Sequence, residues 1–598
     1  MNNNYPQYNE GAGSSHTSNS PQRASNFPIF DQSASNSNSN VKGNELHRAS
    51  DLLMAVSVCT EANFSRIADL ADTAMDELIK AALDGDPLWM PQQNEEAESY
   101  YTLMDIMKMV EVGEPPSSSL LDFELFNTKS DAESNINNNT NLGFKDNQQQ
   151  QQQHYLQTEF SRQTEFVKMD PLSIVGFLMD LEQWSLIFSD IVSRAAILQM
   201  WSSMGPGGTY DGTLQVMTAE FQLASPLVET RESYFGRFCK QLAPYTWGVV
   251  DISLEDLFPY PSIGFCRKPS GCLIQACPDG ISKVMWVEHV EVDNRCVQPM
   301  FQPYINSGLA FGAKRWVSSL VRYCIWQTTL EAKSTSTING DPGLVRHKSE
   351  SLGTNKTQVS ILQAGRLSVL KLAERMTRTF YKVVSGSKEN PWMKIPIPGP
   401  HDIRVMTQKA KENDPGRPPC TSVIFATSAQ VPNNPNEVFQ FLRHEKSRNK
   451  WDILSFGYVI TELACIINGN DSRNRVSIIQ VNSSPRKVEV FYLQESYFDA
   501  TGSYIVYAPV DLFAMSILLR GGNPDNVAIL SSGFVVLPDN LKMNGQEIEA
   551  DGSIVTVALN IVDHSITERI PFDSMVSMHR IMNETVASIK QAFQVQQF

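Results

Sequence analysis

A four-residue string that occurs twice, at 232–235 and 495–498, is the strongest constraint on what this chain of 598 residues can fold into. Both copies read Glu-Ser-Tyr-Phe, and their surroundings recur in the same order. An apolar, helix-like run and then a tryptophan, Trp184 or Trp451, precede each copy, and a segment ending in Val-Asp follows it. Such an internal duplication predicts two domains of one design rather than a solenoid of short repeats.

Each half has the predicted order helix, strands, helix, strands, helix. In the first half we expect helices over Ala49–Leu83, Asp170–Trp184 and Gln302–Trp326, a strand at Glu165–Met169 and an antiparallel meander from Ile191 to His289. In the second half we expect helices over Arg366–Val383, Pro435–Glu445 and Phe572–Phe593, with strands near Asp402–Thr407, at Thr421–Val431 and onward to Val562. A curved sheet must bury its concave face, so each sheet should wrap around the last helix of its half, which is an α+β fold.

Composition sets the expected domain boundaries. Residues 1–48 form a tail rich in Asn and Ser that carries too few apolar side chains to fold, so we predict disorder there. The first domain then covers 49–330, with a disordered insertion at about 113–157 that contains a glutamine run. A hydrophilic linker follows at 331–357, and the second domain occupies 358–598.

The composition also limits the function. The net charge of −16 argues against a general nucleic-acid binder, and no apolar run is long enough for a membrane span. Nine scattered cysteines and a start without an apolar leader indicate a reduced, intracellular protein. Cys266, Cys272 and Cys277 fit no common zinc spacing, and no catalytic or phosphate-binding motif occurs. We therefore expect no enzyme, no metal site and no cofactor.

Several ordered motifs resemble the START lipid-binding domain and the START-associated domain of plant class IV homeodomain-leucine zipper (HD-Zip IV) proteins. In the first half the resemblance rests on the segments 225–228, 231–232, 238–241, Trp247–Asp251, 269–272, Trp286–His289 and Phe311–Trp316. In the second half it rests on Leu370–Met376, Asp402–Met406, 441–443, 451–454 and Tyr507–Asp511. It covers nearly everything from about Ala49 to the end.

The resemblance implies a helix-grip fold, with a tunnel between sheet and last helix that holds one lipid or sterol. The family also carries a homeodomain and a zipper, whereas this sequence shows no Trp-Phe-x-Asn-x-Arg recognition helix. The most basic octamer, Arg443–Lys450, lies at a helix-to-strand corner and is interpreted as a solvated corner rather than a DNA contact. We therefore expect no direct nucleic-acid binding.

Arg231 is the sharpest candidate for a ligand contact, because it stands in an apolar strand at a position where START domains often carry a basic residue. Glu220 on the preceding strand is its expected acidic partner, and the alternative is a surface arginine paired with Glu232. The second half carries Gln494 at the position of Arg231, which suggests a binding half and a structural or relay half.

The remaining candidates are apolar or aromatic residues that would line the tunnel. Strand alternation lets only half of the strand residues face inward, and the sequence leaves that parity open. Ordinary core packing remains the alternative for each of them: Met217, Phe221, Leu223, Tyr234, Phe235, Val249, Trp286, Phe311, Trp316 and Leu320.

The resemblance implies a lipid-binding, ligand-sensitive regulator of transcription, located in the nucleus or in nucleus and cytoplasm, that associates with itself or with HD-Zip IV relatives. In such a protein the lipid would favour one placement of the helix predicted over Gln302–Trp326. Two alternatives stay open. One is an intracellular lipid carrier without a transcriptional role, and the other is a partial sequence of a complete DNA-binding HD-Zip IV factor.

Overall fold

The computed structural model describes residues 48–58, 60–83, 156–201, 209–254, 257, 264–332, 363–409, 414–483, 488–544, 547–562 and 570–594. These residues lie in one compact unit that extends from Glu45 to Phe598. The predictions of a disordered tail and insertion and of a linker fall, apart from a few residues at their edges, outside the described residues. None of the described helices is long and apolar enough to cross a membrane.

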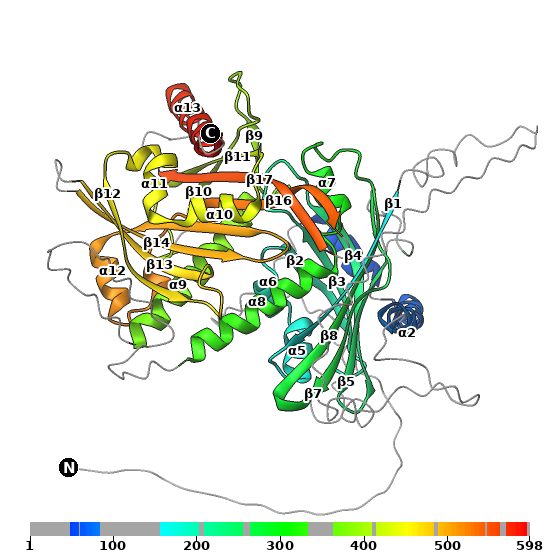
Figure 1. Ribbon diagram of the computed structural model, residues 1–598. Coiled ribbons are helices and arrows are strands. Elements are labelled where there is room, and N and C mark those ends of the chain that lie inside the picture. The colour runs from blue at the N-terminus through cyan, green and yellow to red at the C-terminus, as the bar shows by residue number, and fades with distance from the viewer. Residues whose placement is uncertain are drawn as a thin grey trace, which may run out of the picture. The chain divides into compact units, whose positions relative to one another are not determined.

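The first half is an eight-stranded antiparallel sheet with helices on both faces (Figure 1). Its strands are β1 (Gln157–Val167), β2 (Val192–Trp201), β3 (Leu214–Phe221), β4 (Arg231–Ala243), β5 (Thr246–Ser253), β6 (Phe265–Arg267), β7 (Ser270–Cys277) and β8 (Ile281–Val292). Its helices are α1 (Ala49–Val58), α2 (Glu61–Leu83), α5 (Pro171–Met179), α6 (Leu181–Ile187), α7 (Gln302–Asn306) and α8 (Ala313–Glu331).

The second half contains a nine-stranded antiparallel sheet. Its strands are β9 (Met393–Lys394), β10 (Arg404–Lys409), β11 (Thr421–Val431), β12 (Val459–Ile467), β13 (Arg475–Ser483), β14 (Val488–Phe498), β15 (Ser503–Val510), β16 (Ser532–Asn544) and β17 (Glu547–Val562). Its helices are α9 (Gln363–Val384), α10 (Pro435–Arg443), α11 (Glu445–Trp451), α12 (Leu512–Leu519) and α13 (Phe572–Gln594).

The strand order confirms that the two halves share one design. The first sheet runs β1-β8-β7-β5-β4-β3-β2, with the short strand β6 paired to β8 beside this path. The second contains the same path as β11-β17-β16-β15-β14-β13-β12, extended by β10 and β9. Two short helices follow the first strand of each path, β1 or β11, and the last long helix of each half comes after the neighbouring strand, β8 or β17. The fold class is therefore the predicted one, α+β with two helix-grip sheets.

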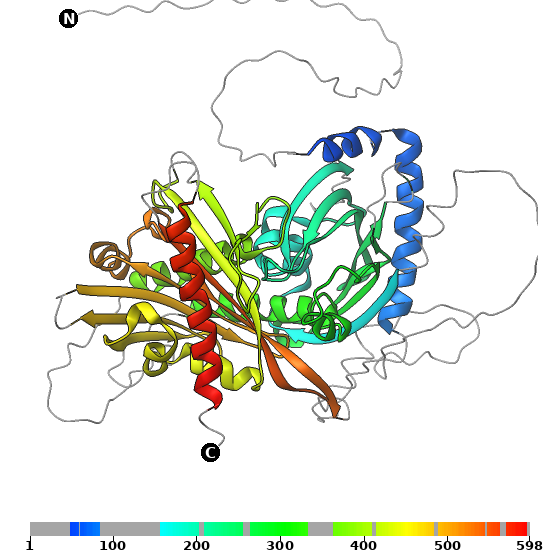
Figure 2. The ribbon, with the colours of Figure 1, turned by 90° about the horizontal axis from the view of Figure 1, so that it is seen from above.

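Each sheet has an inner face toward its last helix and an outer face toward its first one. In the first half, α8 packs on the inner face and α1 and α2 on the outer face; in the second half, α13 and α10 pack on the inner face and α9 on the outer face. Figure 2 shows α2 along the first sheet and α13 across the second. The outer face of the second sheet also shares one hydrophobic core with the first half.

Short polar signals begin the helices that position these sheets. Asp170 caps α5 by accepting a hydrogen bond from the backbone N–H of Ser173, and Pro171 follows in the first turn. Asn434 and Pro435 do the same for α10 in the second half. Because Asp180 caps α6 in turn, the helix predicted from Asp170 to Trp184 is two helices instead of one.

Two other predicted helices are also interrupted. The one expected over Ala49–Leu83 divides into α1 and α2 around Thr60, whose hydroxyl accepts from the backbone N–H of Asn63. The one expected over Gln302–Trp326 divides into α7 and α8, because Gly308 takes a φ of 76° that ends α7. The first strand also begins earlier than predicted, at Gln157 instead of Glu165.

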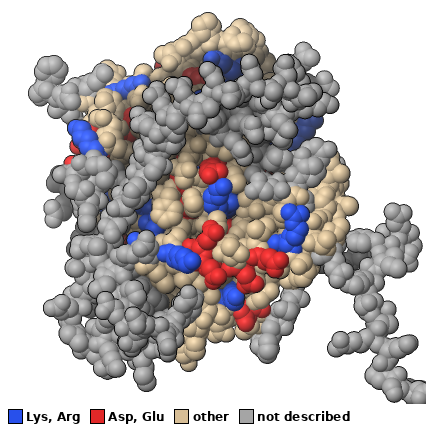
Figure 3. Space-filling view, turned by 90° about the vertical axis from the view of Figure 1, so that its right-hand side faces the viewer, with Lys and Arg blue, Asp and Glu red and all other residues tan. Residues whose placement is uncertain are grey.

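Helix α2 places acidic side chains on the solvent side of the first half. Its exposed positions include Asp69, Asp72, Asp76 and Glu77, while Ile67, Ala71, Met75 and Leu78 are buried against the sheet. Figure 3 shows acidic side chains gathered on one face of the molecule, with lysines and arginines spread singly around them. The described residues that are visible in this view form no continuous basic patch for a phosphate backbone.

Candidate ligand-binding site

Arg231 lies on the inner face of the first sheet. Side chains alternate along β4, so Arg231 and Phe235 point toward α8 while Glu232 and Tyr234 point toward α1 and α2. Arg231 is 8% exposed. The structure therefore supports the buried position and not the surface alternative.

The acidic partner of Arg231 is Glu159 on β1. Its two terminal nitrogens each donate a 2.8 Å hydrogen bond to a different carboxylate oxygen of Glu159, and one also donates to Asn294 Oδ1 at 3.1 Å. The ring of Phe311 lies against the guanidinium, 3.9 Å from its carbon to the ring centroid. A bidentate ion pair of this kind holds both side chains in one geometry.

Glu220 is not the partner of Arg231, and that prediction was wrong. In the β3–β4 register Arg231 is opposite Phe221, whereas Glu220 is opposite Glu232 on the outer face. Arg48 bridges Glu220 and Glu232, and Ser387 of the second half donates to Glu220 at 2.6 Å. Strand alternation thus separates Arg231 from both acids that the sequence suggested.

Two cavities lie on either side of the Arg231–Glu159 pair. The inner cavity has a volume of about 10 Å³, counted as the space in which the centre of a water molecule fits. It is lined by Arg231, Phe265, Arg267 and Trp316, among others. The outer one has about 90 Å³, lies between β1 and the α7–α8 segment, and includes Glu159. They share three lining residues, Glu288, Val290 and Phe311. The pair and the Phe311 ring therefore separate an outer pocket from an inner one.

A second layer of charged groups lies deeper on the inner face. Arg237 donates two hydrogen bonds to Asp251, of 2.7 and 2.8 Å, and Arg267 donates to Glu288 at 3.0 Å. Burial raises the pKa of Glu288 even though Arg267 and the indole of Trp286 favour its charged form. Nε of Arg267 has no hydrogen-bond partner among the described residues. A buried donor beside the inner cavity is thus available to a ligand.

Most of the predicted lining residues form the core under α8 instead of an open tunnel. The ring of Trp316 stacks between those of Trp184 and Trp286, with centroid distances of 6.0 and 5.3 Å. Met217, Leu223, Phe235, Val249 and Leu320 are buried in the same cluster, but neither cavity includes them among its lining residues. Phe221, Phe311 and Trp316 do line the inner cavity, whereas Tyr234 lies on the outer face, where its hydroxyl donates to Asp51 at 3.0 Å.

Two protein families match the two halves of this chain. The START domain matches residues 134–325, and the family described as "PDF2-like, C-terminal domain" matches residues 362–595. Homeobox-leucine zipper protein HDG1 of Arabidopsis thaliana is 35% identical over 570 residues, which cover 93% of this chain and 64% of HDG1. Homeobox-leucine zipper protein HDG3 of the same plant is 40% identical over 442 residues, which cover 73% of this chain and 58% of HDG3.

The chain belongs to the class IV homeodomain-leucine zipper family. It spans about three fifths of the length of these two curated relatives. Among solved structures, human StAR-related lipid transfer protein 5 is 14% identical, with a TM-score of 0.24 and coverage of 39% of this chain and 98% of that one. A likeness this weak carries no argument about function.

The second half of this HD-Zip IV chain has its own buried cation. Gln494 lies on the inner face at the position of Arg231, and Arg448 of α11 donates to its side-chain oxygen at 3.4 Å. Arg448 is 1% exposed and lies 4.4 Å from the ring centroids of both Tyr492 and Tyr507. The interpretation of Arg443–Lys450 as a solvated corner was therefore wrong for Arg448. A guanidinium is present in both halves, supplied by a strand in one and by a helix in the other.

The sequence missed the residues that surround Arg231 in this HD-Zip IV chain. Glu159 lies just after the insertion predicted at about 113–157, close to its glutamine run. Asn294 and Arg267 lie more than 30 residues downstream of Arg231 and carry no local signal. Alternation along 157–167 was the one available clue, since it places Glu159 and Ser161 on one side of a strand.

Proposed function

We propose that the first half of this protein binds one amphiphilic lipid or sterol-like molecule with a carboxylate, phosphate or similarly acceptor-rich head group. The buried Arg231 supports this proposal, because its guanidinium lies between an outer pocket and an inner cavity. The Glu159 carboxylate already occupies the position that the head group of a ligand would take. A ligand head group would replace the Glu159 carboxylate, and its apolar part would displace the Phe311 ring and enter the core. Glu159 acts in this mechanism as an internal competitor for the head group.

The experiment measures the affinity of the purified chain for a fluorescent fatty acid by titration. Glu159→Gln should bind the probe more tightly, because it removes the competing charge. Arg231→Leu should bind it about tenfold to a hundredfold more weakly, the loss expected for charge-assisted hydrogen bonds. Arg295→Leu, which changes an exposed arginine, should bind like the wild type. Equal affinities of wild type and Arg231→Leu would overturn the proposed site.

We further propose that the protein is a nuclear, ligand-sensitive regulator of transcription that associates with HD-Zip IV relatives. The names of its relatives support this, since they are homeobox-leucine zipper proteins, and the match to HDG1 covers 93% of this chain. A tagged copy expressed in plant cells should accumulate in nuclei and co-purify a homeobox relative. A copy that stays outside the nucleus and transfers lipid between vesicles would favour the lipid-carrier alternative instead.

A further inference from the structure

Helix α8 carries two stripes of side chains with different partners. Trp316 and Leu320 belong to the core under the first sheet, and Trp316 lines the inner cavity. Arg315, Ser319 and Arg322, spaced four and three residues apart, point instead toward Asp190. The helix that covers the cavity is therefore also held at a second place.

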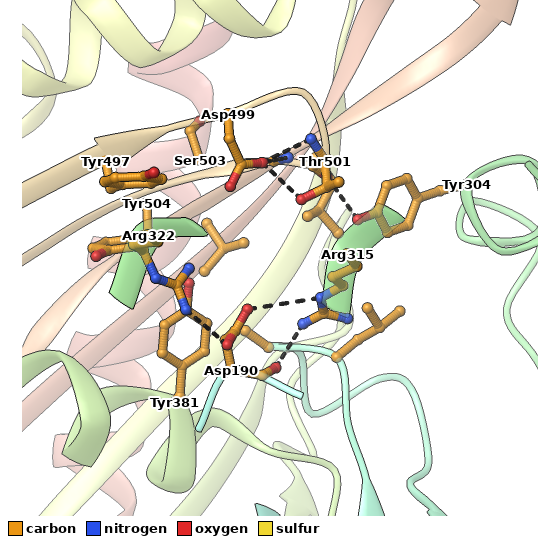
Figure 4. Close-up of a pocket in the computed structure, with 15 residues that line it drawn as sticks. Asp190, Tyr304, Arg315, Arg322, Tyr381, Tyr497, Asp499, Thr501, Ser503 and Tyr504 are labelled. Carbon is orange, nitrogen blue, oxygen red and sulfur yellow. Dashed lines mark hydrogen bonds and ion pairs between the residues drawn. The ribbon is translucent and has the colours of Figure 1, made fainter. Parts of the chain in front are cut away.

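That second place is the junction between the two halves. Arg322 donates to Asp190 at 2.7 Å, and its guanidinium lies 5.6 and 5.8 Å from the ring centroids of Tyr497 and Tyr504 on the second sheet. A cavity of about 30 Å³ lies here, lined by residues of both halves (Figure 4). Burial alone would raise the pKa of Asp190, but Arg322 and Arg315 hold it below its ordinary value. The junction is thus a buried, charged contact, costly to disturb.

Tyr304 of α7 makes a direct hydrogen bond across the same junction. It is 1% exposed, and its hydroxyl contacts the backbone oxygens of Thr501 in the second half, at 2.7 Å, and of Leu309, at 3.1 Å. Phe311, which covers Arg231, lies in the same segment, seven residues after Tyr304. One continuous stretch of chain therefore touches both the proposed ligand site and the second half.

From these contacts we propose that the α7–α8 segment is a latch that couples ligand occupancy to the junction between the halves. This inference rests on the proposed lipid-binding function. The inner cavity has room for no more than about one water molecule, so a lipid enters only if one wall moves. The sheet wall is a continuous hydrogen-bonded ladder, whereas the α7–α8 wall contains Gly308 at a positive φ. Because Phe311 and Tyr304 lie in one segment, movement of Phe311 away from Arg231 displaces Tyr304 and breaks the hydrogen bond from its hydroxyl to the backbone oxygen of Thr501.

The coupling has a definite sign. If binding breaks a junction contact, then removing that contact beforehand must make binding tighter, because the two free energies are linked reciprocally. The junction contacts therefore favour the closed, empty state. Ligand in turn loosens the turn that contains Thr501, between β14 and β15.

The test compares two tyrosines at the same junction. Tyr304→Phe removes the hydroxyl that contacts Thr501 and keeps the ring, so we expect it to bind a fluorescent fatty acid about threefold to tenfold more tightly than the wild type. Tyr497→Phe is the matched control. The ring of Tyr497 lies against Arg322, but its hydroxyl makes no hydrogen bond among the described residues, so its affinity should not change. A thermal melt of each variant checks the fold.

A second measurement needs no variant. Hydrogen exchange of the wild-type protein should become faster at residues 499–503 when the fatty acid is added. Tighter binding by Tyr304→Phe alone, together with this faster exchange, supports the latch. Equal affinity of all three proteins, or exchange that the fatty acid leaves unchanged, overturns the latch and leaves the lipid site standing. Absence of saturable binding by any of them overturns the proposed function and the latch with it.

Discussion

At the scale of single residues, the two copies of the repeated string keep the same orientation but have different surroundings. Glu232 and Glu495 both point to the outer face of their sheet. Glu232 is partly exposed and pairs with Arg48. Glu495 is buried and accepts hydrogen bonds from the hydroxyls of Thr377 and Tyr504, both at 2.7 Å. Burial raises the pKa of Glu495 above its ordinary value, although Tyr504, Thr377 and Arg322 favour the charged form.

This raised pKa predicts a pH-dependent effect of Glu495→Gln. A carboxyl whose folded pKa is raised contributes stability that is fully present below its ordinary value of 4.5 and is lost as the pH rises through the folded value. A glutamine side chain at this position cannot ionise, and both neighbouring hydroxyls can accept as well as donate. The substitution should therefore increase the free energy of unfolding more at pH 8 than at pH 5, measured by urea titration. Glu182→Gln, at an exposed position of α6, should show no such difference between the two pH values.

At the scale of elements, close packing at Gly312 fixes the start of α8, after Gly308 has ended α7. A Cβ there would lie 2.3 Å from the backbone oxygen of Gly308 and 2.6 Å from Oγ of Ser161 on β1. The backbone N–H of Ala313 donates to the same Ser161 hydroxyl at 2.9 Å. The start of α8 is thus held against the edge of the first sheet, next to the outer pocket.

Substitution of two glycines tests this packing. Gly312→Ala should lower the free energy of unfolding by about 1–3 kcal/mol, the usual cost of overpacking. Gly176→Ala, inside α5 and with no atom within 4 Å of the added Cβ, should raise it by about 0.5–1 kcal/mol. Chemical denaturation of both variants measures the difference. A stabilising Gly312→Ala would mean that the α8 start is not held as closely as described.

At the scale of the whole molecule, the halves are joined by buried polar contacts as well as by apolar packing. Oγ of Ser225 and of Ser428 are 2.9 Å apart, and the hydroxyl of Thr329 donates to Asn468 Oδ1 at 2.9 Å. Gly386 follows α9 and lies so close to the first half that a Cβ would be 2.0 Å from the backbone oxygen of Val228. These contacts leave no room for a side chain at that point of the junction.

We therefore predict that the two halves associate when they are produced as separate chains, 1–332 and 358–598. Co-expression with a tag on one chain should recover both, because each would otherwise expose its share of a common apolar core. Gly386→Val in the second chain should abolish the recovery of the first, since its side chain meets the backbone at Val228. Recovery of the tagged chain alone from the unsubstituted pair would contradict this prediction.

The sequence by itself determined the duplicated design, through the repeated string and its surroundings. It also determined the order of elements and the helix starts at Asp170 and Pro435, because these depend on periodicity and on capping chemistry within a few residues. The family resemblance singled out Arg231 as a candidate, but the sequence left a buried and a surface position open, and the structure decided for the buried one. The partner of Arg231 was decided by tertiary structure alone, since β1–β8 pairing and the alternation of β4 place Glu159 beside it and Glu220 behind the sheet. The same is true of Arg448 in the second half and of the junction at Arg322. Such contacts join residues tens to hundreds of positions apart, and no local pattern records which of them meet.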